Sequence, residues 1–191
     1  MKLQLKKISW IQIGYTFRNR LDFMDKGVTA VIQMKDLRNE SYVDCGNLAR
    51  IDMGNVKEHH LVKPGDIVFR SRGLVTTAAI LTEDPGAAVV ASPLMKVHVD
   101  SSMVLPEYLT WYINQPGSQA FLASRAKGTA QKMISKQTLA NLEIELPSLE
   151  RQYAIVEVAE LVRKEQHLLK EIANRRNIYL SRKLMRASQA K

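Results

Sequence analysis

Hydrophobic and polar positions change in short runs along the first 146 residues of the chain. Runs rich in β-branched and other apolar residues, some of them alternating with polar residues, are typical of β-strands. Pro64-Gly65-Asp66 and Asp84-Pro85-Gly86 are turn sequences that each precede such a run. We therefore expect strands within residues 6–17, 27–37, 67–69, 74–81, 88–91, 94–99 and 143–146, with 67–69 and 74–81 paired as a hairpin.

Three shorter helices are predicted between the strand within residues 94–99 and the strand within residues 143–146. Pro106 occupies the position of a first-turn proline and opens the segment PEYLTWYINQ. The segment GSQAFLASRAKG follows as a second helix, with Gly128 as its stop. Ser135 is the expected N-cap of a helix of one or two turns in SKQTLANL.

The period changes after Pro147. Residues 148–191 contain neither proline nor glycine, and Ser148 is a plausible N-cap. The predicted helix has about 40 residues and a length of about 60 Å. A domain this small cannot cover a helix of that length, so its apolar stripe needs a partner helix from the same chain or from another. The stripe has heptad-like spacing, is interrupted by Glu165, Arg175 and Arg182, and consists of Ile155, Val158, Leu161, Val162, Leu168, Leu169, Ile172 and Tyr179.

These elements predict an α+β fold with two parts. Residues 1–146 form a mixed globular domain of short strands and helices, and residues 147–191 form one long C-terminal helix. The 191 residues suffice for one domain of ordinary size and an appendage.

Charge and cysteine content narrow the class of protein. The 28 Lys and Arg against 19 Asp and Glu give a net charge of +9, which favours a polyanionic partner such as nucleic acid. A merely solvated basic surface gives the same composition. The single cysteine, Cys45, cannot form an internal disulfide. Lys6 and Lys7 interrupt the N-terminal apolar residues, and no run is long enough for a membrane span, so we expect a cytoplasmic protein.

Signatures of catalysis and of metal binding are missing from the sequence. It has no Walker A loop, no GxGxxG and no HExxH, and its carboxylates form no evident pair. His59 and His60 are adjacent and therefore point in different directions, which argues against a metal site. Cys45, His98 and His167 are interpreted as structural or solvated. We therefore predict a binding protein and not an enzyme, with a nuclease or methyltransferase fragment as the catalytic alternative.

Basic and amide side chains gather in or beside the predicted turns. Each one alone could be a solvated loop charge. As a set they favour nucleic-acid binding, because arginine suits guanine and phosphate whereas glutamine suits adenine. The candidate DNA-binding residues are Arg18, Arg20, Arg70, Arg72, Lys127, Gln131, Lys132 and Lys136.

An ordered set of motifs resembles the specificity subunits of type I restriction–modification systems. The recognition domains of that family contain a Pro-Gly-Asp strand, matched here at residues 64–68. They end in a Gly-small-Gln segment, a short helix, a strand closed by Leu-Pro, and a Leu-x-x-Gln helix start. Residues 14–20 fit the family pattern less well, which leaves the roles of Arg18 and Arg20 less certain. The matching C-terminal residues are Gly128, Ala130, Gln131, Ile134, Ser135, Leu146, Pro147, Leu149 and Gln152.

The resemblance implies a DNA specificity subunit of half length, with one target recognition domain and one long helix. Two such helices would pair as an antiparallel coiled coil, in a homodimer or with a second specificity chain. Methyltransferase subunits would dock on the helix. Those subunits and a restriction subunit would carry S-adenosylmethionine, ATP and Mg, so no cofactor is expected on this chain. Gln131 and Lys132 could contact DNA or the junction with the helix.

A double-stranded DNA target in a bacterial or archaeal cytoplasm follows from the same resemblance. The alternatives are a non-catalytic helical-dimer adaptor and a stand-alone DNA-binding protein outside restriction–modification.

Overall fold

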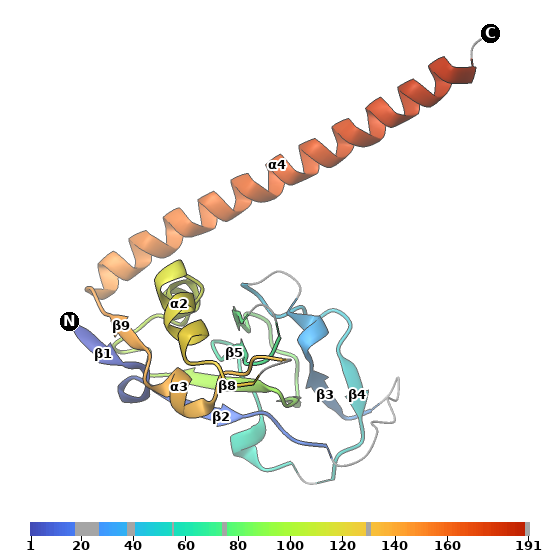
Figure 1. Ribbon diagram of the computed structural model, residues 1–191. Coiled ribbons are helices and arrows are strands. Elements are labelled where there is room, and N and C mark those ends of the chain that lie inside the picture. The colour runs from blue at the N-terminus through green and yellow to red at the C-terminus, as the bar shows by residue number, and fades with distance from the viewer. Residues whose placement is uncertain (18–26, 38–40, 55, 74–75, 129–130, 190–191) are drawn as a thin grey trace. The chain divides into compact units, whose positions relative to one another are not determined.

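The structure is a computed structural model that describes all residues except 18–26, 38–40, 55, 74–75, 129–130 and 190–191. The chain forms two compact units, Met1–Tyr153 and Ala154–Lys191. Short strands and helices followed by a long C-terminal helix confirm the predicted α+β fold (Figure 1). Among the described residues, no helix is both long and apolar enough to cross a membrane.

The largest sheet has four antiparallel strands in the order β2–β8–β5–β6. β5 follows the predicted turn, where Gly65 has a φ of +90°, a conformation that favours glycine. β5 is buried except at Arg70, and it pairs with β6 as the predicted hairpin. The strands are β2 (Ser9–Ile13), β5 (Ile67–Arg70), β6 (Ala78–Ile80) and β8 (Leu94–Val99).

Two smaller sheets contain the other strands found among the described residues of the first unit. One has the order β4–β3–β7, with β3 parallel to β7 and antiparallel to β4, and the other pairs β1 with β9. The sequence did not predict β1 or β4, each of which has only three residues. These strands are β1 (Lys2–Gln4), β3 (Thr29–Ile32), β4 (Ala49–Ile51), β7 (Ala88–Val90) and β9 (Glu143–Glu145).

One buried core lies between the β3–β7 face and the larger sheet. Ile32 of β3, Val68 of β5 and Leu94 of β8 belong to one buried cluster. Side chains alternate between the faces of a strand, so Val31 and Val89 pack into a second cluster on the opposite face of the small sheet. Ile67 and Phe69, whose side chains point to the other face of β5, are fully buried as well, so β5 is covered on both faces.

Three short helices follow β8. α1 (Pro106–Ile113) begins at the predicted proline, and α2 (Pro116–Ser124) comes next. Ser135 caps α3 (Lys136–Ala140) by accepting a hydrogen bond from the Thr138 amide at 3.0 Å. The prediction that Gly128 ends the second helix is wrong, because α2 ends at Ser124. Lys127 instead pairs through its backbone with Met133, which requires extended chain before Gly128.

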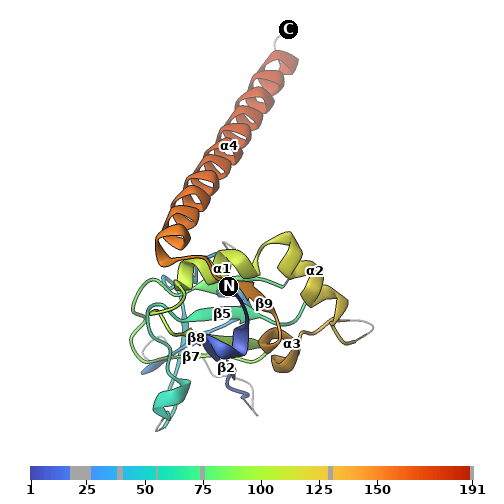
Figure 2. The same ribbon diagram turned by 90° about the vertical axis from the view of Figure 1, so that its left-hand side faces the viewer.

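The edge strand β6 is covered by the residue that follows α1. The Asn114 side chain accepts from the Ala78 amide and donates to the Ala78 carbonyl, both at 2.8 Å. α1 and α2 lie on the β5 side of the large sheet, away from β2 (Figure 2). The long helix is α4 (Leu149–Gln189), as predicted, and short 3-10 helices are η1 (Leu5–Lys7), η2 (Met34–Asp36) and η3 (Glu58–His60).

Candidate nucleic-acid interface

The C-terminal end of β5 meets Lys127 and residues 131–133, which are distant from it in sequence but close to one another. Lys127 and Met133 exchange two backbone hydrogen bonds of 3.0 and 2.8 Å, and Met133 also forms a bridge with Arg72. The Gly73 amide donates to the Lys132 carbonyl at 3.3 Å. This backbone pairing brings together five of the predicted DNA-binding residues. We call them the β5-end cluster: Arg70, Arg72, Lys127, Gln131 and Lys132.

Ser71, which lies between Arg70 and Arg72, anchors this part of the chain in the protein interior. It is 2% exposed, and its hydroxyl donates to the Pro93 carbonyl. Its own carbonyl accepts from the Ile134 amide at 2.8 Å. With Ser71 turned into the protein, the neighbouring Arg72 is exposed.

Gly128 allows the loop of the cluster to turn back on itself. Its φ is +109°, and a Cβ at this position would lie 2.5 Å from the Gln131 carbonyl oxygen. A side chain here would therefore be strained and would push Gln131 away.

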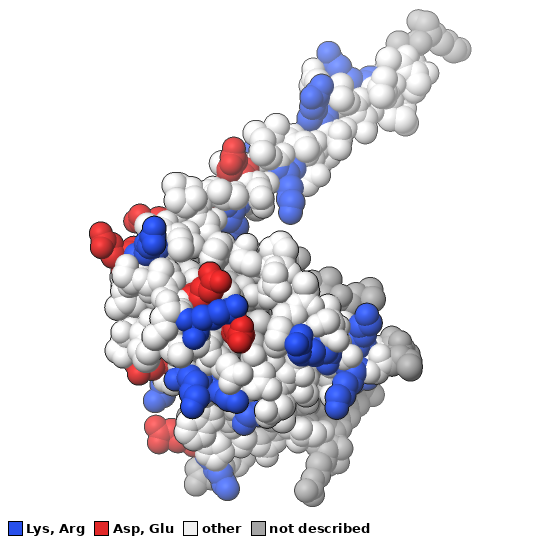
Figure 3. Space-filling view, turned by 60° about the vertical axis from the view of Figure 1, so that its left-hand side comes forward, with Lys and Arg blue, Asp and Glu red and all other residues white. Residues whose placement is uncertain are grey.

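The β5-end cluster is strongly basic. Arg72, Lys127 and Lys132 are exposed, and Arg70 is half-buried, with its Nε donating to the Arg72 carbonyl at 3.3 Å. Among the described residues, no carboxylate forms an ion pair with these four cations. Figure 3 shows Lys and Arg side chains over one face of the first unit, with fewer Asp and Glu among them. Cations without carboxylate partners attract a phosphate backbone.

The other predicted DNA-binding residues are Lys136, Arg18 and Arg20. Lys136 is the exposed first residue of α3, two positions after Ile134. Arg18 and Arg20 lie outside the described residues. Lys136 therefore follows the β5-end cluster directly along the chain. The DNA-binding role of each of these residues stays a prediction.

Gln152 fixes the start of α4 on the first unit. It is fully buried, and its side chain contacts three backbone groups at Leu105, Met103 and Pro147. Ser148 accepts from the Arg151 amide at 3.4 Å, as expected of a cap. The Leu-Pro and Leu-x-x-Gln motifs of the sequence therefore form a structural joint.

The apolar stripe of α4 is open to solvent. Within α4 only Gln152 is buried, and Ile155 is half-buried. Val158, Leu161 and Ile172 are each at least 60% exposed. The other predicted members, Val162, Leu168, Leu169 and Tyr179, are exposed as well, as are Ile178, Leu180, Leu184 and Met185.

The exposed face of β2 and β8 is a feature that sequence reasoning missed. Trp10 and His98 are cross-strand partners on this face, and His98 pairs with the buried Asp66 at 2.7 Å. The alternation of Trp10 and Gln12 with Ile11 was a local signal for an outward-facing Trp10. Nothing local indicated which strand would lie beside it.

Comparison with known proteins identifies relatives of the chain. A family model described as the type I restriction modification DNA specificity domain matches residues 1–175. The EcoBI type I restriction enzyme specificity subunit of Escherichia coli is 25% identical over 120 residues, which cover 62% of this chain and 25% of that protein. The chain therefore spans about a quarter of the curated relative.

Solved structures share the fold. A chain from a structure on complex assembly and conformational transition of the type I R-M system has a TM-score of 0.68 at 18% identity, covering 90% of this chain and 40% of that one. The HsdS subunit from Thermoanaerobacter tengcongensis has a TM-score of 0.61 at 17% identity, with coverages of 90% and 39%. The S subunit from M. genitalium has a TM-score of 0.59 at 15% identity, with coverages of 90% and 41%.

Proposed function

Because the chain belongs to the type I restriction modification DNA specificity family, we propose that it recognises DNA sequence for a type I restriction–modification complex. It directs adenine methylation and restriction to a bipartite target and catalyses neither reaction. Its length fits one recognition domain with one long helix.

The β5-end cluster is the observation that supports this proposal. Its four cations are contributed by separate segments, are held by backbone pairing, and have no carboxylate partner among the described residues. Lysines and arginines on phosphates position a protein on the duplex, and arginine or glutamine side chains read base edges in the major groove. Gln131 is the proposed reader of a base edge, and Arg70, Arg72, Lys127, Lys132 and Lys136 are the proposed phosphate contacts.

The exposed stripe of α4 supports a second part of the proposal. Two α4 helices pair antiparallel in a coiled coil, in a homodimer or with another specificity chain, and a recognition domain stands at each end. A helix of about 60 Å exceeds one DNA turn of roughly 34 Å. The pair therefore sets a non-specific spacer between two half-sites.

Partner subunits supply the chemistry in this proposal. Methyltransferase subunits dock on α4 and transfer the methyl group of S-adenosylmethionine. A restriction subunit uses ATP and Mg. This chain itself needs no cofactor, and the complex acts on DNA in the cytoplasm.

Salt-dependent binding to a mixed-sequence DNA duplex tests the role of the β5-end cluster. Each phosphate contact contributes a slope of about −0.9 to log K against log salt. If Arg70 and Arg72 both contact phosphates, R70A with R72A should weaken binding and flatten the slope by about two. Fluorescence anisotropy at several salt concentrations measures both quantities.

The matched control removes the same two charges elsewhere. R175A with R176A lies on α4 and should leave the slope within error of the wild type. Equal losses in the two double variants would mean that net charge alone drives binding. Unchanged affinity of R70A with R72A would remove these arginines from the interface. A wild-type affinity that does not fall with added salt would favour the helical-dimer adaptor.

A further inference from the structure

Trp10 is a large aromatic side chain left in solvent on a sheet face. It is 68% exposed on β2 and lies directly opposite His98 of β8. Trp10 and His98 both line two adjacent hollows, of about 480 Å³ and about 600 Å³. Volumes of this size accommodate small organic ligands, and a flat exposed indole is a surface on which another flat ring can stack.

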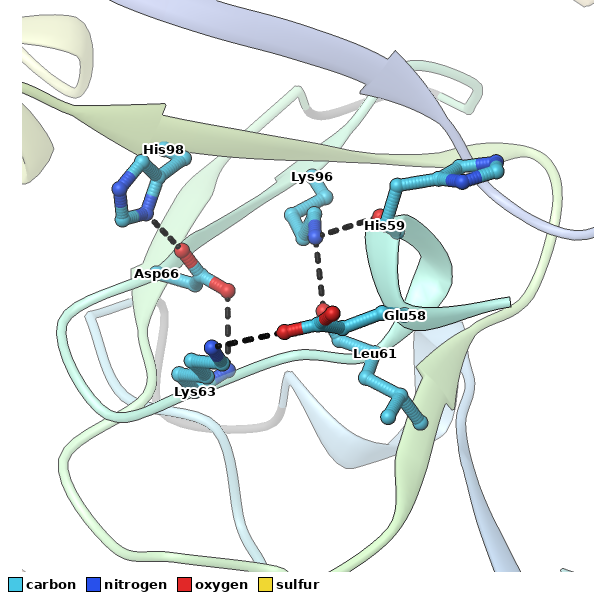
Figure 4. Close-up of polar contacts among 7 residues, drawn as sticks. All are labelled: Glu58, His59, Leu61, Lys63, Asp66, Lys96 and His98. Carbon is cyan, nitrogen blue, oxygen red and sulfur yellow. Dashed lines mark hydrogen bonds and ion pairs between the residues drawn. The ribbon is translucent and has the colours of Figure 1, made fainter. Parts of the chain in front are cut away.

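A buried carboxylate orients His98 beside the first hollow (Figure 4). Asp66 is 2% exposed, and its Oδ1 lies 2.7 Å from His98 Nδ1. Its Oδ2 accepts from the Lys63 amide at 2.9 Å, so the carboxylate is fixed at both oxygens. An ionised carboxylate can only accept, so His98 Nδ1 carries the proton. His98 Nε2 is then the free nitrogen, and in the neutral ring it is a hydrogen-bond acceptor.

The lysines of the first hollow are already engaged by the protein. Lys96 Nζ donates to the His59 and Leu61 carbonyls at 2.9 and 2.7 Å, and Lys63 Nζ lies 3.7 Å from Glu58 (Figure 4). Burial lowers the pKa of Lys96 from its usual range. Lys63 and Lys96 are balanced in charge by Glu58 and Asp66. The hollow therefore suits an uncharged ring with polar edges better than it suits a phosphate.

The second hollow has a basic balance. Among the described residues that line it, Lys6 and Lys7 are the lysines and Asp100 is the carboxylate. Asp100 is occupied by Ser102, whose hydroxyl and amide donate to it at 2.7 and 3.0 Å. Lys7 is exposed, and Lys6 makes a 3.2 Å contact with Asn141 at the surface. A phosphate beside Trp10 would meet these two lysines.

From this geometry we infer that the Trp10 face binds an unpaired nucleobase together with its phosphate. The base stacks on Trp10, and the phosphate contacts Lys6 and Lys7. His98 Nε2 accepts from an exocyclic amino group, so adenine and cytosine are preferred over thymine. The ligand is a free nucleotide or an unpaired base of a strand, because bases inside a duplex have no free ring face.

This site is separate from the β5-end cluster. Arg70 pairs with Leu94 at one end of β8, whereas His98 lies near the other end. The inference goes beyond the proposed function, which requires duplex binding only, and neither rests on the other.

Fluorescence of Trp10 tests the inference directly. The chain has two tryptophans, so W111F leaves Trp10 as the one reporter. Titration of this full-length variant with dAMP should give saturable quenching, with weaker binding of dTMP. Equilibrium dialysis with labelled dAMP should show a loss of about five- to 150-fold in W10A, the range expected for one stacked base. K6A with K7A should weaken dAMP but leave deoxyadenosine unchanged.

Controls separate the possible outcomes. Y153A removes another exposed aromatic side chain and should bind dAMP like the wild type. An oligodeoxyadenylate that binds at least tenfold more tightly than dAMP identifies a strand as the ligand, and equal binding identifies the free nucleotide. Absence of saturable quenching at millimolar dAMP, or unchanged dialysis in W10A, overturns the inference. An oligoglutamate peptide that quenches Trp10 at a lower concentration than dAMP does would also overturn the inference and indicate an acidic protein partner.

W10A also distinguishes this site from the duplex interface. Trp10 is exposed, so circular dichroism should show a folded protein. The duplex salt slope of W10A should equal that of the wild type. A lost slope in W10A would merge the two sites and contradict their separation.

Discussion

Gln152 joins three backbone segments through one side-chain amide. Its Oε1 accepts from the Leu105 amide at 2.9 Å, and its Nε2 donates to the Met103 and Pro147 carbonyls, both at 3.1 Å. Buried polar groups are costly unless they are paired, so these four groups depend on one another. The first turn of α4 is held to the first unit by this residue.

Replacement of Gln152 should therefore destabilise the fold. Q152A leaves the buried Leu105 amide without its acceptor and opens a small cavity, and we expect the free energy of unfolding to fall by about 2–4 kcal/mol. Urea unfolding followed by circular dichroism measures the change. Q137A, at an exposed position on α3, is the control and should stay within about 0.5 kcal/mol of the wild type. A Q152A midpoint equal to that of Q137A would contradict the joint.

The sequence indicated some residues of the candidate sites and missed others, for a physical reason. The basic residues of the β5-end cluster lie beside turns, and the residue types that favour a turn are adjacent in the sequence. Asp66 and His98 are 32 positions apart and meet because β5 and β8 pair. That pairing is a tertiary event, so no local pattern marked His98 as part of a site.

Tyr108 links two elements, α1 and β9. Its hydroxyl donates to the Glu145 carbonyl at 2.6 Å, and the side chain is 3% exposed. Burial raises the pKa of Tyr108 to about 12, with the neighbouring Tyr112 and Glu145 adding to the shift. The neutral phenol is thus favoured by the fold, and its contact holds β9 just before α4 begins.

The shift predicts a loss of stability at high pH. An unfolded tyrosine titrates near 10, so the contribution of Tyr108 is complete below about pH 10 and is lost as the pH rises toward about 12. Urea unfolding at several pH values should show this decline in the wild type. Y108F should lack this part of the decline and be less stable at pH 7 by about 0.5–1.5 kcal/mol. Y153F, which changes an exposed tyrosine, should behave like the wild type, and a Y108F profile equal to it would refute the assignment.

Elements were predictable where their signals are local. Runs bounded by proline and glycine turns gave β5, β6, β7 and β8, and the proline and serine signals gave α1 and α3. β1 and β4 are too short to show a period of two. The end of α2 was misplaced because backbone pairing of Lys127 with Met133 outweighs the local stop signal at Gly128.

For the whole molecule, the apolar stripe of α4 is the feature that calls for a second chain. Leu161 is 64% exposed and Leu168 is 57% exposed, and they are separated by seven residues, as in a coiled-coil seam. No residue of α4 other than Gln152 is buried. A single helix with this stripe leaves a large apolar area in water, and we expect pairing with another α4 to remove it.

We therefore expect the wild type to sediment as a dimer at micromolar concentration, whereas L161E with L168E should sediment as a monomer of 21.6 kDa. The matched control is H167E with N174E, which has the same spacing of seven on the opposite face of α4, since each residue turns the helix by about 100°. It should remain dimeric.

Identical chains related by a two-fold axis read identical half-sites, so the dimer should protect a palindromic bipartite target, and the monomer only one half. A single-chain mass for the wild type, or equal dissociation of both variants, would rule out pairing through this stripe.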